Sequence, residues 1–95
     1  MIHKSAKITC DPLKRERTLQ ERGLDFLDAA QVFEGMTLTL EDDRFDYGET
    51  RFQTYGVLDD RVVMIVWTPR GESRHVISMR HCHEREARKV WQHLG

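Results

Sequence analysis

The residues best suited to chemistry lie in the range 74–86, where an apolar segment carrying two arginines runs into a charged segment. This range contains neither glycine nor proline, so its ionisable groups are expected to sit on rigid backbone. On an extended strand, Arg80 shares a face with Ser78 and Val76 and lies opposite Ile77. If Ile77 faces helices, the Arg80 guanidinium lies on an open face, where it would bind a phosphate and stabilise developing negative charge. The alternative is a structural ion pair with a carboxylate from the acidic middle of the chain.

A second candidate pair is a carboxylate and a guanidinium, those of Glu49 and Arg51. The two residues lie two positions apart where a predicted strand begins, so their side chains are expected to point the same way. A carboxylate beside a guanidinium stays ionised and is able to accept a proton, while the guanidinium holds an anionic group of a substrate. The alternative is an ion pair at the rim of the protein that adds little stability.

Two histidines and a further carboxylate follow Arg80 in the sequence. His81 is expected on the same strand face as His75, whereas His83 begins the next helix. Imidazole is the usual proton shuttle near neutral pH, so His81 or His83 is a candidate proton donor. A histidine on an apolar strand face is more often a hydrogen-bonded, partly buried residue. Glu86 is a candidate base, although its place in a first helical turn is explained by the helix dipole alone.

Neither a metal site nor a disulfide framework is predicted. The consecutive residues His81, Cys82 and His83 diverge on a strand or a helix, and the chain has no CxxC or HExxH spacing. Its two cysteines, Cys10 and Cys82, are expected to be free thiols packed as small apolar groups. No cofactor is therefore expected.

Charge is strongly segregated along the chain despite a formal net charge of −1. Residues 1–23 carry a net charge of +3, residues 24–60 carry −8, and residues 61–95 carry +4. Basic surfaces attract nucleic acid, and a separate acidic surface repels it or docks a basic partner. The usual alternative is that a charge run is a solvated helix face. The basic candidates are Lys4, Lys7, Lys14, Arg15 and Arg17 near the start and Arg85, Arg88 and Lys89 near the end.

The elements that position these residues begin with two helices. Asp11 is a candidate cap for a helix over residues 12–22, which Gly23 would end in a left-handed conformation. Asp25 is a candidate cap for a second, shorter helix, in which apolar residues recur at helical spacing until Gly35 closes it.

Strands dominate the rest of the chain. A short strand is expected over residues 5–10, followed after the two helices by strands at 36–40, 51–58, 61–68 and 73–81, and then by a helix at 84–94. The uninterrupted apolar run within 61–68 predicts a central strand buried on both faces. The order β-α-α-β-β-β-β-α predicts one α+β domain over residues 1–95. Its antiparallel meander would be covered by helices on one face and partly open on the other. Since no segment resembles a membrane span or a signal peptide, a cytoplasmic location is expected.

Several sequence motifs, in this order and spacing, resemble the BrnT toxins of bacterial type II toxin-antitoxin systems. They are Asp11-Pro12 with Lys14, Arg22-Gly23-Leu24-Asp25-Phe26, Ala29-Ala30, Val32-Phe33, Gly48-Glu49 with Arg51, Tyr55-Gly56, Val66-Trp67-Thr68, and Arg74 with Ile77-Ser78-Met79-Arg80 and Glu86. The resemblance implies a fold similar to the RelE toxins. It also implies a metal-independent endoribonuclease that inhibits translation and in which the 2′-hydroxyl attacks the adjacent phosphate. Its partner would be an antitoxin similar to BrnA, with a ribbon-helix-helix DNA-binding domain, so that DNA is contacted only through the antitoxin.

The resemblance also suggests roles for the candidate residues. Arg80 would bind the phosphate, Glu49 or Glu86 would be the base, and His81 or His83 would supply a proton. The RNA-binding residues would be Lys14, Arg51, Arg74 and Arg85.

Two other function classes are compatible with the sequence. One is a non-catalytic module that binds a regulatory protein, and the other is a nucleic-acid-binding domain that leaves RNA intact. The antitoxin has two candidate docking surfaces, the basic site itself or the acidic middle block that contains Asp42, Asp43 and Asp46.

Overall fold

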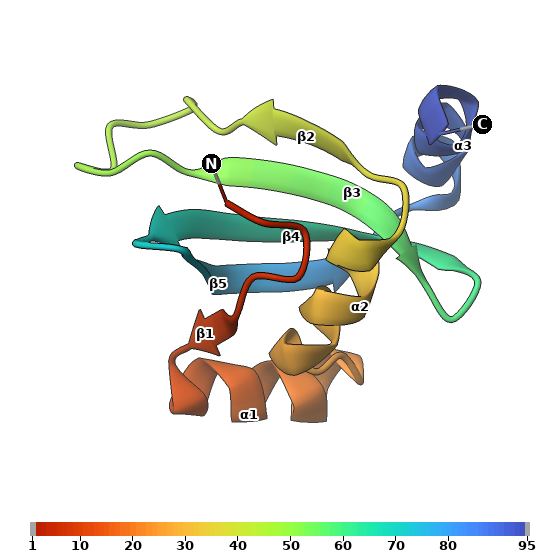
Figure 1. The fold of residues 1–95 in the computed structure, drawn as a ribbon. Coiled ribbons are helices and arrows are strands. Elements are labelled where there is room, and N and C mark those ends of the chain that lie inside the picture. Colours follow the sequence, from red (N-terminus) through yellow and green to blue (C-terminus); the bar gives the residue numbers. More distant parts are fainter. Residues whose placement is uncertain (1, 95) are drawn as a thin grey trace.

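A computed structural model describes residues 2–94, in which three α-helices and one 3₁₀ helix pack against a five-stranded sheet of order β1-β5-β4-β3-β2 (Figure 1). None of the helices in this range is long and apolar enough to cross a membrane. The elements are β1 (Ile8–Cys10), α1 (Pro12–Arg22), η1 (Phe26–Asp28), α2 (Ala29–Glu34), β2 (Leu38–Glu41), β3 (Phe52–Leu58), β4 (Arg61–Arg70), β5 (Ser73–His81) and α3 (Glu84–Leu94). This order confirms the predicted α+β arrangement.

Local signals place the helix ends as predicted. The Asp11 side chain accepts a hydrogen bond of 2.9 Å from the backbone N–H of Leu13, and Gly23 adopts a φ of 68° at the other end of α1. Asp25 caps the next helical segment in the same way. Its first turn is a 3₁₀ helix, however, and the α-helix begins only at Ala29.

The antiparallel meander is confirmed for β2 to β5, but the sheet is mixed because β1 pairs with β5 in parallel. The predicted opening strand is shorter, since only residues from Ile8 onward pair. β4 is longer than predicted and continues through Pro69 to Arg70. Proline is tolerated there because the pairing with β3 reaches only as far as Trp67, so Pro69 has a strand neighbour on one side alone.

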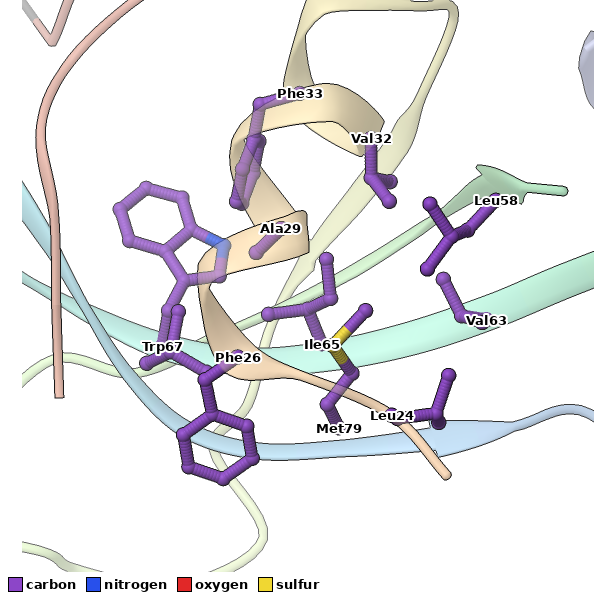
Figure 2. Packing of buried hydrophobic residues seen from close by; sticks show 11 residues of the cluster. Leu24, Phe26, Ala29, Val32, Phe33, Leu58, Val63, Ile65, Trp67 and Met79 are labelled. Carbon is purple, nitrogen blue, oxygen red and sulfur yellow. The ribbon is translucent and has the colours of Figure 1, made fainter. Parts of the chain in front are cut away.

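The main core lies between the sheet and the segment formed by η1 and α2 (Figure 2). β4 is buried on both faces, as its apolar run predicted. Gly56 on β3 lets α2 approach closely, because a Cβ atom there would lie 2.5 Å from a methyl group of Val32. The buried residues of this cluster are Leu24, Phe26, Ala29, Val32, Phe33, Leu58, Val63, Ile65, Trp67, Val76 and Met79.

A smaller core lies on the opposite face, beneath α3. Val90 and Leu94 of this helix pack with Val62 of β4 and with the partly buried Tyr55 of β3. The apolar side of α3 therefore occupies one end of the second face, so this face is partly open, as predicted. Among residues 2–94 no helix covers the rest of that face, which is called the open face below.

An irregularity at Ile77 changes which β5 side chains reach the open face. Val76 pairs with Trp67 and Ser78 pairs with Val66, so Ile77 is an extra residue in β5. Side chains before it therefore switch faces relative to those after it. Val76 is buried in the main core rather than beside Arg80, which corrects the prediction from regular alternation.

Candidate active site

An ion pair between Arg80, near the end of β5, and Glu86, in the first turn of α3, is the best-defined charged feature of the open face. Two parallel hydrogen bonds join them, from Nη1 to Oε1 at 2.8 Å and from Nη2 to Oε2 at 3.0 Å. Arg80 Nη1 also donates to the carbonyl oxygen of His81 at 3.2 Å. The two side chains are 33% and 29% exposed, so solvent reaches the pair. The carboxylate partner of Arg80 thus comes from α3 and not from the acidic middle block.

The ion pair changes the acidity of both groups. Hydrogen bonding to Arg80 lowers the pKa of Glu86 to about 2, and the backbone N–H of His83 adds to this effect. The same hydrogen bonds raise the pKa of Arg80. While the pair is closed, Glu86 is ionised and is a weak base.

Two further groups next to the pair were not identified from the sequence. Burial, followed by the charge of Glu86, raises the pKa of the Cys82 thiol to about 12. The same two causes raise the pKa of Tyr55. Tyr55 on β3 and Arg80 on β5 both pair with Met64 on β4, which therefore lies between them. Both groups therefore stay protonated at neutral pH, and the Tyr55 hydroxyl remains a hydrogen-bond donor. Only the strand pairing brings Tyr55 to this site.

The predicted pair of Glu49 and Arg51 forms, and Arg70 joins it. Arg51 Nε donates to Glu49 Oε2 at 3.1 Å, and Arg70 Nη2 lies 3.8 Å from Glu49 Oε1. The Arg51 guanidinium also stacks 4.0 Å from the ring centre of Tyr47. This cluster lies where β3 begins and β4 ends.

The two charged clusters lie at opposite ends of the sheet. Arg70 and Met64 are six positions apart on β4, and Arg80 lies directly beside Met64. Six strand residues span about 20 Å. Arg70, the partner of Glu49, is therefore separated from Arg80 by about this distance along the sheet, whereas Arg80 and Glu86 are in contact.

The histidines differ in where they lie. His75 is on the open face, where its Nδ1 lies 2.8 Å from the hydroxyl of Thr9, and burial, followed by the charge of Arg70, lowers its pKa. His81 lies on the core face, opposite Arg80, and burial lowers its pKa as well. Its Nδ1 is buried without a hydrogen-bond partner among residues 2–94. His83 is exposed and directly precedes α3, so it is the histidine whose backbone lies next to Glu86.

The predicted RNA-binding residues also separate. Lys14 and Arg85 are exposed, and Lys14 borders a groove between α1 and β5 that Ser78 also lines. Arg74 is buried on the opposite face of the sheet, so it does not join the open face as expected. The extra residue Ile77 is the reason for this difference.

Across the described range 2–94, no group of three His, Cys, Asp or Glu side chains is arranged to hold a metal ion.

A family model for the ribonuclease toxin BrnT of type II toxin-antitoxin systems matches residues 11–86. The chain belongs to this family. The match extends from the cap of α1 to Glu86, so it includes both members of the ion pair on the open face. Among curated proteins no match was found. Membership makes the chain a ribonuclease toxin, with RNA as its substrate and an antitoxin as its partner.

Proposed function

We propose that this toxin is a metal-independent endoribonuclease in which Arg80 binds the reacting phosphate on the open face of the sheet. The observation that carries the proposal is the two-bond ion pair with Glu86, which holds a partly exposed guanidinium in one orientation on a rigid strand. A planar pair of N–H donors matches two phosphate oxygens and is well suited to stabilising the additional negative charge of a phosphorane.

Glu86 is the base in this proposal. A phosphate that binds Arg80 competes with the carboxylate for the same N–H donors, so Glu86 is released and its pKa rises toward the ordinary value. The freed carboxylate then takes the proton of the 2′-hydroxyl while the 2′-oxygen attacks phosphorus. The bond to the 5′-oxygen breaks, and that oxygen takes a proton from His83. The products are a cyclic phosphate and a free 5′-hydroxyl.

The second charged cluster has a different role in the proposal. Because Glu49 pairs with Arg70, whose backbone lies about 20 Å from that of Arg80 along the strand direction, it is not the base for that phosphate. Arg51 and Lys14 instead bind phosphates further along the same RNA, and Arg85 extends the contact along α3. Such contacts provide affinity that falls as salt concentration rises.

An RNA cleavage assay on the purified toxin, with and without EDTA, tests the proposal. We expect cleavage in EDTA, and we expect Arg80→Ala and Glu86→Gln to remove it. Arg88 and Glu84 offer a matched control, since they form an exposed ion pair at 3.5 Å on the same helix. Arg88→Ala and Glu84→Gln should cleave RNA like the unmodified toxin. A folded Arg80→Ala protein with full activity would refute the assignment.

The antitoxin of this toxin is proposed to carry a ribbon-helix-helix DNA-binding domain and to inhibit RNA cleavage by binding the toxin. Co-purification of the complex, followed by RNA cleavage and DNA-binding assays, tests both points. The complex should bind DNA and leave RNA intact, while the free toxin should cleave RNA and not bind DNA.

A further inference from the structure

A cavity of about 490 Å³ lies on the helix-covered face of the sheet, away from the open face. Its walls are largely apolar, with Phe52, Trp67 and Pro69 exposed to the cavity. Thr39 on the edge strand β2 forms one side, and Arg74 on β5 forms part of the lining. The cavity therefore combines apolar surface with one cation.

Arg74 is unusual because it is buried without a negatively charged partner in the described part of the chain. It is 8% exposed, and its guanidinium stacks 4.1 Å from the ring centre of Phe33 and 5.3 Å from that of Trp67. Its Nη1 donates to the carbonyl oxygens of His3 and Lys4, while its Nε has no hydrogen-bond partner among residues 2–94.

The electrostatics agree with this geometry. Burial alone lowers the pKa of Arg74, with no contribution from a nearby carboxylate. Across the described residues 2–94, no Asp or Glu lies within salt-bridge distance of Arg74, and Glu72 borders the cavity without pairing with it. A buried charge without a counter-charge is costly, so an anionic group entering the cavity would be stabilised.

We propose that this cavity receives an apolar side chain and an adjacent carboxylate from one segment of the antitoxin. The proposal rests on the antitoxin partnership given under the proposed function, but not on the assignment of Arg80. Charge around the cavity favours a protein segment over RNA. Glu72 lines the cavity, and the loop between the two strands that carry Thr39 and Phe52, residues 42–51, has four acidic residues and two arginines. This net negative charge repels a polyanion but accepts basic residues flanking a single carboxylate.

Filling the cavity tests the proposal without altering Arg74. Thr39→Trp would place a large side chain in the cavity, whereas Leu40→Trp places the same side chain on the opposite face of the same strand. Thr39 also shares a hydrogen bond of 2.8 Å with the hydroxyl of Thr54, so Thr39→Val controls for its loss. Each protein is titrated with the purified antitoxin by calorimetry, and its folding is checked by thermal melting.

We expect Thr39→Trp to weaken antitoxin binding about 30-fold, as loss of a central anchor does, while the two control variants stay close to the unmodified toxin. Equal affinity of a folded Thr39→Trp protein would overturn the proposal. A Thr39→Trp protein that binds the antitoxin with full affinity but no longer cleaves RNA would also overturn the proposal, because the cavity would then bind RNA. If the unmodified toxin cleaves no RNA, the proposed function fails. The calorimetric titration with the antitoxin still tests whether the cavity binds it.

A small-molecule probe tests the same chemistry if Thr39→Trp does not fold. Trp67 and Trp91 are the two tryptophans of the chain, so Trp91→Phe leaves Trp67 as a fluorescent reporter in the cavity wall. N-acetylphenylalanine should change its emission and bind several-fold more tightly than the corresponding amide, which lacks the carboxylate. Equal binding of acid and amide, or no binding of either, would contradict the proposal.

Discussion

Arg74 and Arg80 lie on the same strand, six positions apart, yet they occupy different environments. Arg80 lies on the open face, is one-third exposed and is paired with Glu86. Arg74 lies on the core face, is almost fully buried, and stacks on aromatic rings, with no carboxylate partner among residues 2–94. In a regular strand an even spacing would place both on one face. The extra residue Ile77 separates them.

The comparison shows how one irregular residue gives two identical side chains different properties. A guanidinium that is exposed and held by a carboxylate is available for exchange with a phosphate. A guanidinium that is buried under its own N-terminal segment stabilises the fold and leaves a positive charge beside a cavity. The following changes test this division, starting with the largest expected effect.

Val76→Asp should abolish stable folding. The extra residue Ile77 turns Val76 toward the main core, where its side chain is 1% exposed, so an aspartate there would be a buried carboxylate without a partner. Thermal unfolding followed by circular dichroism should show no cooperative transition. Ile77→Ala keeps the extra backbone residue and should unfold cooperatively, at a cost of about 1 kcal/mol. A Val76→Asp protein of normal stability would show that Val76 does not face the core.

Arg80→Ala should reduce RNA cleavage about 100- to 1,000-fold, the usual effect of removing a donor that stabilises transition-state charge. The free energy of unfolding should change by less than about 1 kcal/mol, because the ion pair is partly exposed. Single-turnover cleavage and urea denaturation measure the two quantities. A large loss of stability with unchanged cleavage would show that Arg80, like Arg74, stabilises the fold and does not act on RNA.

Arg74→Met should show the reverse pattern. It removes the stacking on Phe33 and Trp67 and the hydrogen bonds to the carbonyl oxygens of His3 and Lys4. The free energy of unfolding should fall by about 1 to 3 kcal/mol in urea denaturation. RNA cleavage by the folded protein should not change. A loss of cleavage in folded protein would show that Arg74 contributes to the open face after all.

The smallest effect should appear in the pH dependence of stability. Hydrogen bonding to Arg80 lowers the pKa of Glu86 from 4.5 to about 2. The Glu86 carboxylate therefore binds a proton near pH 4.5 in the unfolded chain but only near pH 2 in the folded protein. The stabilisation is complete above pH 4.5 and is lost as the pH falls to about 2. We expect it to contribute less than about 1 kcal/mol, since solvent screens the pair.

Urea denaturation of the unmodified toxin and of Glu86→Gln at several pH values measures this contribution. The difference between the two proteins should be largest at neutral pH and should close at low pH. A difference that does not depend on pH would show that the ion pair is not its source.

The sequence by itself determined the elements and the family. Capping residues define α1 because Asp11 and Gly23 act on their immediate neighbours, and the apolar run of β4 indicates a central strand whatever its partners. The order and spacing of the motifs are local as well, and they were sufficient for the resemblance to BrnT that the family match confirmed. Arg80 was also correctly placed on the open face.

Only the tertiary structure decided which side chains meet. The parallel pairing of β1, the packing of α3 on the second face and the extra residue in β5 depend on contacts between segments far apart in the chain. These contacts joined Arg80 to Glu86, separated it from Glu49 and buried Arg74. Capping and periodicity act over one or two turns and therefore leave a readable pattern. The register of paired strands is selected by how whole faces pack, so it leaves no equivalent local signal.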